Sequence, residues 1–238
     1  MNMIIVTILG AHSGTPKGVA VRNTSLRLLI GATAVTGLLM AGGQAQAACP
    51  VPLDHGHVDV VGLAYEDGSL EIAVHDESGA EEVEYAPEDV TLRALPGAKT
   101  TIPADPAYSF LGTAGKPVWI LPEVQNPDLL WAGFGAEELE TGVLQDDEVD
   151  VSFLSVKGPG RLAVYTDDVF GEPETVLVNS GDGLPDTVEV QAGDHTHANW
   201  AFTRAGTYTV KVRAAAHLAA DGSPVSSRTV TYAFEVRK

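Results

Sequence analysis

HVDVVGL at residues 57–63 and SLEIAVH at residues 69–75 are two alternating stretches, joined through Glu66-Asp67-Gly68. Apolar side chains recur at every second position, which is the pattern of a β-strand with one buried face. Asp-Gly between two such stretches is typical of a tight hairpin turn, because both residues tolerate a positive φ. This part of the chain is therefore predicted to be a β-hairpin.

Further alternating stretches are predicted to be strands, at residues 148–156, 161–166, 187–190, 198–203, 207–215 and 227–236. Glycine-rich turn signals such as Gly158-Pro159-Gly160 and Gly181-Asp182-Gly183 separate them. Residues 78–146 are less regular, with one helical turn expected at 136–139. Many short strands with frequent turns are typical of a sandwich. We predict an all-β fold, a β-sandwich built either as one domain or as two packed Ig-like sheets or subdomains that divide near residue 147.

The first 47 residues have the features of a secretory signal peptide. They contain three basic residues and no acidic residue, and the apolar run Leu28–Met40 is followed by Ala45-Gln46-Ala47. A basic flank, a short apolar core and an A-x-A exit are the three parts of such a signal. Residues 48–238 are therefore predicted to be an exported domain, secreted freely or associated with the cell surface, without an integral membrane segment after cleavage.

The exported part is strongly acidic and has a single cysteine. After Ala47 there are 11 basic and 32 acidic side chains, a net charge of about −21. Such a charge repels nucleic acid and anionic membranes, so no nucleic-acid partner is expected. Cys49 cannot form a disulfide within the chain. It follows the predicted cleavage site by two residues, but Gln46 departs from a lipobox, so lipidation is the minor alternative.

Histidines are clustered in the sequence rather than scattered. His55-Gly56-His57 and His195-Thr196-His197 are both H-x-H pairs, and side chains two apart in a strand share a face. Neutral imidazole binds zinc, copper, nickel or iron, and a neighbouring carboxylate can bind or orient a ligand. The sequence predicts one site for zinc or another divalent transition metal, with His57, His75, His195 and His197 as ligands, His55 as substitute and Asp59 in support.

No catalytic motif is recognisable in the sequence, which contains no G-x-S-x-G elbow, no P-loop and no G-x-G-x-x-G before a helix. The protein is therefore expected to bind a ligand rather than to catalyse a reaction. Two alternatives to metal binding stay open. One is a cell-wall or carbohydrate adhesion module that uses Trp119 and Trp131. The other is haem capture through one or two histidines.

Two groups of residues resemble known families. The stretch Gly193–Thr203 (GDHTHANWAFT), followed by Gly206–Tyr208, resembles the actinobacterial surface-anchored protein repeat. Gly56–Asp59, Val118–Pro122 and Leu130-Trp131 resemble the choice-of-anchor M domain that accompanies this repeat. The resemblance implies an exported protein encoded beside an ABC transporter of the metal-uptake type, and surface capture or relay of zinc or manganese. The histidines favour zinc.

Overall fold

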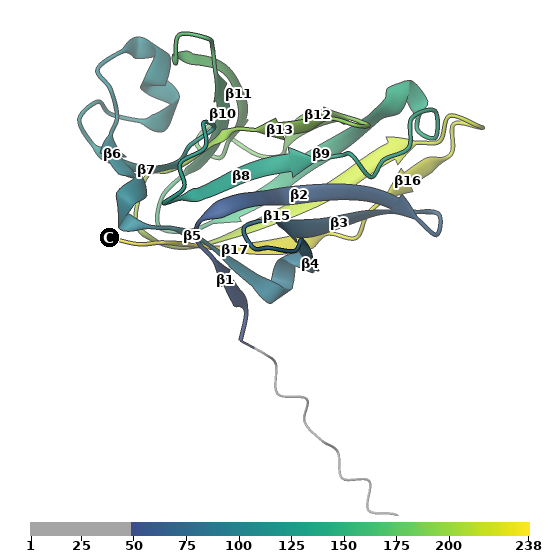
Figure 1. Ribbon diagram of the computed structural model, residues 1–238. Coiled ribbons are helices and arrows are strands. Elements are labelled where there is room, and N and C mark those ends of the chain that lie inside the picture. Colours follow the sequence, from purple (N-terminus) through teal and green to yellow (C-terminus); the bar gives the residue numbers. More distant parts are fainter. Residues whose placement is uncertain (1–48) are drawn as a thin grey trace, which may run out of the picture. The chain divides into compact units, whose positions relative to one another are not determined.

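The strands form three sheets in the computed structural model, which describes residues 49–238 (Figure 1). The leader predicted over residues 1–47 lies outside the described residues. The largest sheet has the order β1 (Val51–Leu53), β5 (Val90–Ala94), β17 (Val230–Val236), β15 (Gly206–His217), β9 (Glu148–Lys157) and β12 (Asp186–Gln191), with β16 (Pro224–Ser226) paired to β15.

The other two sheets have five strands each. One has the order β13 (His195–His197), β8 (Leu130–Gly135), β2 (Gly56–Glu66), β3 (Ser69–Asp76) and β4 (Val83–Tyr85). The other has the order β11 (Pro173–Asn179), β10 (Leu162–Asp167), β14 (Asn199–Phe202), β7 (Pro117–Leu121) and β6 (Lys99–Thr101). Four short 3-10 helices lie between strands: η1 (Pro87–Asp89), η2 (Pro96–Ala98), η3 (Pro106–Leu111) and η4 (Gln145–Asp147).

The mostly β architecture predicted from the alternation is confirmed, including the first hairpin. Strands β2 and β3 pair in antiparallel fashion around a turn in which Asp67 and Gly68 both have a positive φ, 48° and 83°. The segment 136–139 is a turn, closed by the Leu139 amide donating to the Ala136 carbonyl, rather than a helix.

Strands from both sides of position 147 occur in every sheet. β17 pairs with β5, β14 pairs with β7, and β13 pairs with β8. Residues 49–238 belong to one compact unit by their contacts. Because β8 pairs with β13 on one side and with β2 on the other, the second H-x-H pair lies one strand away from His57.

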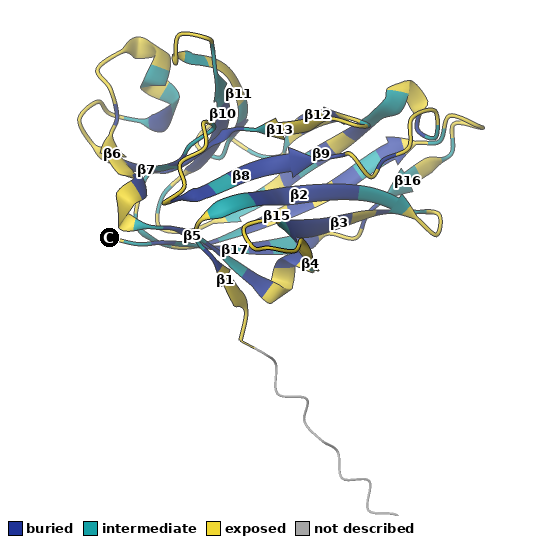
Figure 2. Ribbon diagram, in the orientation of Figure 1, coloured by how far each residue is buried: buried dark blue, intermediate teal, exposed yellow. Residues whose placement is uncertain are grey.

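A continuous aromatic core lies between the sheets. Phe134 of β8 lies 5.7 Å, centroid to centroid, from Trp200 of β14 and 6.5 Å from Phe153 of β9. All three side chains are buried, and Figure 2 shows β8 and the middle of β2 as buried ribbon. Each such side chain stabilises the fold by roughly 1.5–3 kcal/mol through its burial. The core therefore fixes the inner face of the β13-β8-β2-β3-β4 sheet and leaves its other face free for polar groups.

A bulge in β2 decides which of its side chains share that outer face. Asp59 pairs with His75 and Gly62 pairs with Ala73, so β2 has one more residue than β3 between these pairs. The extra residue returns Asp59 and Gly62 to the same side of the sheet. Val60 and Val61, which form the bulge, are both fully buried.

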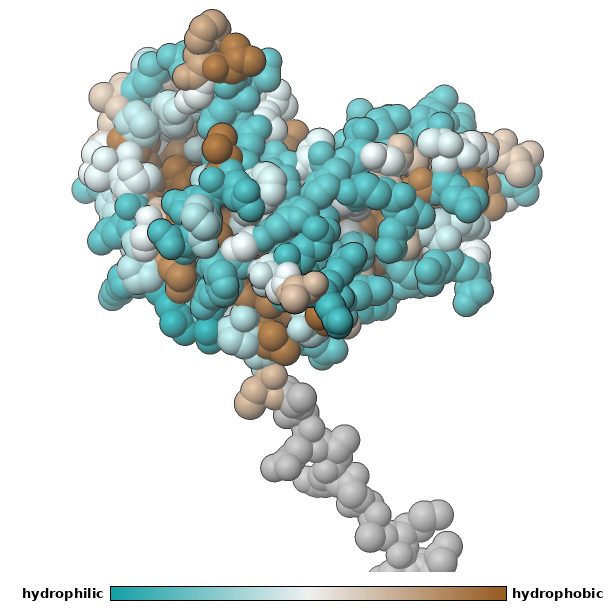
Figure 3. All heavy atoms as spheres, viewed as in Figure 1, coloured by the Kyte–Doolittle hydropathy of each residue, from teal (hydrophilic) through white to brown (hydrophobic). Residues whose placement is uncertain are grey.

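The surface is predominantly hydrophilic on the face seen in Figure 3, in keeping with the net charge of −18. Within residues 49–238, no helix is both long enough and apolar enough to cross a bilayer.

Candidate metal centre

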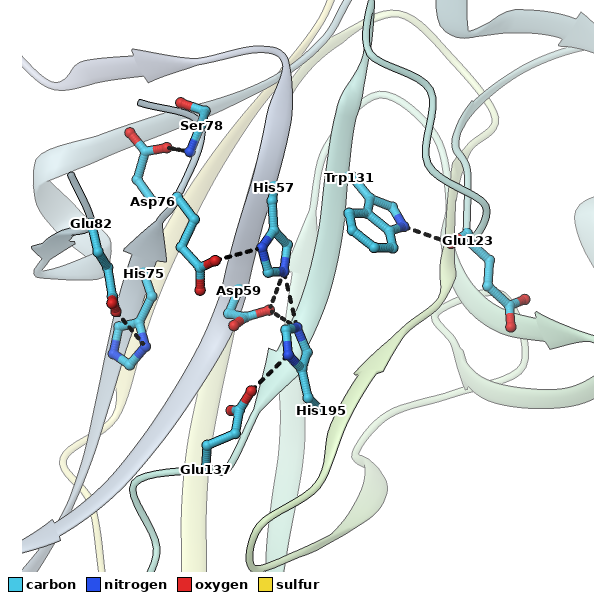
Figure 4. Close-up of polar contacts among 11 residues, drawn as sticks. His57, Asp59, His75, Asp76, Ser78, Glu82, Glu123, Trp131, Glu137 and His195 are labelled. Carbon is cyan, nitrogen blue, oxygen red and sulfur yellow. Dashed lines mark hydrogen bonds and ion pairs between the residues drawn. The ribbon is translucent and has the colours of Figure 1, made fainter. Parts of the chain in front are cut away.

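Two strands that flank β8 bring together, on the outer face of the sheet, four side chains that could hold a metal ion. His57 and Asp59 come from β2, and His195 and His197 come from β13. One nitrogen or oxygen from each residue lies within 4.8 Å of the others. Strand β8 runs between β2 and β13, so the four side chains reach over it from either side. Figure 4 shows the His57, Asp59 and His195 side chains converging.

Glycines of β8 form the floor beneath this group. Gly133 pairs with His197 on one side and with Asp59 on the other. A Cβ at Gly133 would lie 2.6 Å from Asp59 Oδ1 and 2.8 Å from His197 Cε1, both closer than real Cβ contacts. A Cβ at Gly135 would similarly lie 2.8 Å from Asp59 Oδ2. The space in which the four side chains meet therefore exists because β8 has no side chain at either position.

Two further carboxylates fix the orientation of two imidazoles. Glu77 Oε2 lies 2.9 Å from His57 Nδ1, and Glu137 Oε1 lies 2.6 Å from His195 Nδ1. An ionised carboxylate only accepts hydrogen bonds, so each Nδ1 must carry the proton that it donates. The Nε2 atom of each ring then turns toward the centre of the group, in the carboxylate–histidine arrangement that is usual behind metal-bound histidines.

This tautomer leaves electron pairs facing one another. His57 Nε2 and His195 Nε2 are 2.9 Å apart, and Asp59 Oδ1 lies 3.5 Å and 3.1 Å from them. With both Nδ1 atoms protonated, two neutral rings have no hydrogen to share across that gap. The three atoms then form an electron-rich point that a cation would stabilise, since a divalent ion accepts all three electron pairs at once.

Several polar atoms of this group are also buried without a hydrogen-bond partner among the described residues. Asp59 is 2% exposed, and its Oδ1 has no hydrogen bond among the described residues. Burial raises the pKa of Asp59, although His195 and His57 act in the opposite direction. Both ring nitrogens of His197 are also buried without a partner in this part of the chain. Burial, with additional effects of His57 and His195, lowers the pKa of His197 to about 4, so its ring is neutral and free to bind a metal.

Trp131 completes one wall of the site. Its ring stacks on His197 with centroids 3.6 Å apart and an angle of 8° between the planes. The indole Nε1–H donates to the Glu123 carbonyl oxygen at 2.6 Å (Figure 4). The indole is thus held at both its face and its edge, and it holds the His197 ring in one orientation.

The structure brings together four of the six residues predicted as ligands or their support. His55 is outside the group: its side chain is 63% exposed and its Nδ1 lies 2.8 Å from Asp54 Oδ1. Gly56 has a φ of 78°, so the strand begins after His55 and the period-two rule does not apply to this pair. His75 is also outside the group. It pairs with Asp59 across the strands, but its ring lies over Gly62.

The sequence alone did not identify Glu77, Glu137, Gly133 and Gly135 as parts of the site. The two carboxylates lie just after β3 and β8, where an acidic chain offers many similar residues. No strand was predicted over residues 130–135, so nothing in the sequence indicated that Gly133 and Gly135 share one face of a strand.

Two other groups of residues are less suited to binding a ligand than the histidine group is. Trp119 is 4% exposed, so it is part of the core and does not form a surface platform with Trp131. Glu148, Asp150 and Glu189 form a second group with the spacing of metal ligands on β9 and β12. Asp150 and Glu189 are exposed, and exposed acidic side chains have water as a partner. The histidine group is therefore the best-formed site in the described part of the chain.

No protein-family model, no curated protein and no solved structure matched this chain. The resemblance to the surface-anchored repeat therefore stays a prediction, and the chemistry of the site carries the functional argument.

Proposed function

We propose that this protein binds a divalent transition metal through His57, Asp59, His195 and His197, and that zinc is the preferred ion. The observation that carries the proposal is the convergence of two Nε2 electron pairs and a buried carboxylate oxygen within 3.5 Å, with both Nδ1 atoms engaged by glutamates. Three nitrogens and one oxygen are ligands that zinc accepts in tetrahedral geometry. Manganese prefers sites richer in oxygen ligands.

The ligand set supports holding an ion rather than hydrolysis. Catalytic zinc sites have three protein ligands and keep a fourth position open, whereas sites with four protein ligands are closed. Four residues surround the centre here. We therefore propose a non-catalytic role, in which an exported protein captures the ion and passes it to a surface ABC uptake system. The leader-like residues 1–47 support export, and the family resemblance supports the transporter.

Zinc titration calorimetry on residues 48–238 tests the binding proposal. The wild-type protein is expected to bind one zinc ion, and the double variant His195→Ala/His197→Ala is expected to lose at least 100-fold in affinity, since two of four ligands are removed. His217→Ala is the matched control, because His217 lies at the far end of β15 and outside the ligand group. A double variant that binds zinc as tightly as the wild type would refute the site.

A second experiment tests which ion the site prefers. Competition among zinc, manganese and calcium ions is expected to favour zinc. It can be followed through the change in tryptophan emission that is lost in a Trp131→Phe variant, since Trp131 stacks on His197. Preference for manganese or calcium would contradict the choice of zinc while leaving the metal site intact.

A further inference from the structure

A second, smaller core lies on the outer face of the β11-β10-β14-β7-β6 sheet, under η3. It consists of Ile102, Leu111, Val118, Ala163, Tyr165 and Ala201. The residues next to these in β7, β10 and β14 pack into the main core on the opposite face. The second core borders a cavity with a volume of about 550 Å³, in which Ile102 and Leu111, only 4% and 2% exposed, form an apolar floor.

Two basic residues of the cavity share the face of this second core. Side chains two positions apart in extended chain point to the same side of a sheet. Lys116 comes two positions before Val118, and Arg161 comes two positions before Ala163. The pairing extends to Lys116, because the Ile102 amide donates to the Lys116 carbonyl oxygen at 2.9 Å. The two cations therefore stand beside the apolar floor and not on the side of the main core.

Hydrogen bonds hold the rim of the cavity in place. The Thr203 amide donates to the Arg161 carbonyl oxygen at 3.1 Å, and the Arg161 amide donates to Thr203 Oγ1 at 2.8 Å. Arg204, the third basic residue of the lining, follows directly, and the hydroxyl of the buried Tyr208 donates to its carbonyl oxygen at 2.7 Å. A Cβ at Gly160 would lie 2.6 Å from Thr203 Oγ1, so the loop 158–160 packs closely against this rim. The cavity is thus largely preformed, as sites for small ligands usually are.

The charge of the cavity is opposite to that of the protein. Its lining contains Lys116, Arg161 and Arg204 and no acidic residue, although acidic side chains outnumber basic ones by 32 to 11 after residue 47. The ion pairs that lysine and arginine form with carboxylates within residues 49–238 all involve other arginines. The three cations therefore have no carboxylate within 4 Å in this part of the chain, and their charge is available to an anion.

These features favour a ligand that has both an anionic group and an apolar part. Guanidinium groups match the oxygens of phosphate and carboxylate in geometry. Three cations favour a phosphate monoester, with a charge of about −1.5 to −2 near pH 7, over a carboxylate with a single charge. Pro117 and Pro159 add apolar surface to the floor. The volume corresponds to roughly eighteen water molecules at about 30 Å³ each, so a ligand of about ten to fifteen heavy atoms fits.

We propose that this cavity binds a phosphate monoester of a short aliphatic alcohol. Lys116, Arg161 and Arg204 hold the phosphate group, and Ile102 and Leu111 contact the aliphatic stem. The proposal does not depend on the metal centre, since the two sets of residues do not overlap.

Hexyl phosphate is the probe. Inorganic phosphate has its charge without the stem, 1-hexanol has the stem without the charge, and heptanoate has the same stem with a carboxylate. Titration of metal-free protein, residues 48–238, is expected to show saturable binding of hexyl phosphate with amide chemical-shift changes at Gly112 and Gly160. Inorganic phosphate is expected to bind at least tenfold more weakly, heptanoate several-fold more weakly, and hexanol not at all.

Variants locate the binding. Lys116→Gln/Arg204→Gln is expected to weaken hexyl phosphate at least tenfold, and Arg161→Gln several-fold. The control Lys211→Gln/Arg213→Gln removes the same charge from exposed positions of β15 outside the cavity, and it is expected to leave the affinity within twofold. The variant His195→Ala/His197→Ala is also expected to bind hexyl phosphate normally, so this proposal and the metal site fail separately.

Four results would overturn the proposal. Absence of saturable binding, or shift changes confined to residues outside the cavity, would show that the cavity is not the site. Equal binding of inorganic phosphate or of hexanol would show that charge and stem are not recognised together. Heptanoate binding as tightly as hexyl phosphate would reject the phosphate monoester. An equal loss of affinity in Lys211→Gln/Arg213→Gln would show general attraction to positive charge.

Discussion

Gly133→Ala is the substitution that most directly tests whether an ion is held above β8. The new Cβ would lie 2.6 Å from Asp59 Oδ1 and 2.8 Å from His197 Cε1, where ordinary contact begins at 3.4 Å. Both side chains would have to move by roughly 0.6–0.8 Å. Distances between a metal and its ligands vary by only about 0.2 Å among good sites. One methyl group therefore displaces two of the four ligands by several times that tolerance.

The expected result is a loss of at least about 100-fold in zinc affinity, which corresponds to about 2.8 kcal/mol. The metal-free variant should also be less stable by roughly 1–3 kcal/mol, the usual cost of adding a methyl group to a closely packed place. Competition with a chromophoric chelator measures the affinity, and chemical denaturation in the presence of chelator measures the stability.

Gly97→Ala is the matched control. Its Cβ would meet only Leu129 Cδ2, at an ordinary 3.6 Å, so neither zinc affinity nor stability should change appreciably. A Gly133→Ala protein that folds and binds zinc within threefold of the wild type would refute the proposed position of the ion above β8. Equal losses in both variants would refute the steric reasoning.

Two further predictions concern charged groups. Glu137→Gln should weaken zinc about tenfold, because an amide oxygen orients His195 less firmly than a carboxylate does; unchanged affinity in the chelator competition would contradict this role. Hydrogen bonds from Arg228 lower the pKa of Glu88, so this pair stabilises the fold above the ordinary glutamate pKa and loses its contribution as the pH falls through the lowered value. The free energies of unfolding of wild type and Glu88→Gln should therefore converge as the pH falls below the ordinary glutamate pKa of about 4.3, and a constant difference would disprove the linkage.

The sequence was sufficient for local features of the site and insufficient for non-local ones. The spacing of His195 and His197 predicted two rings on one face, since both residues lie in a short extended strand. The same rule was wrong for His55 and His57, because the positive φ of Gly56 ends the alternation. Nothing in either segment indicates that β8 lies between them.

The partners of β8 depend on register between distant segments. Its pairing with β2 is parallel and joins residues more than seventy positions apart, and its pairing with β13 joins residues about sixty apart. Such pairings follow from how whole faces pack, which periodicity alone does not determine. His75 shows the same limit, because its ring direction depends on the space above Gly62 rather than on its own strand position.

The separation of the proposed ligands along the chain bears on when a metal ion could bind. His57 and His195 are 138 positions apart, and strand β8 must lie between their strands before they meet. An unfolded chain offers these residues only as two separate local pairs, His57 with Asp59 and His195 with His197, and a partly synthesised chain has only the first pair. Metal loading would therefore follow folding. For a chain exported unfolded, the metals available in the destination compartment, and not those where the chain is synthesised, would decide which ion it carries.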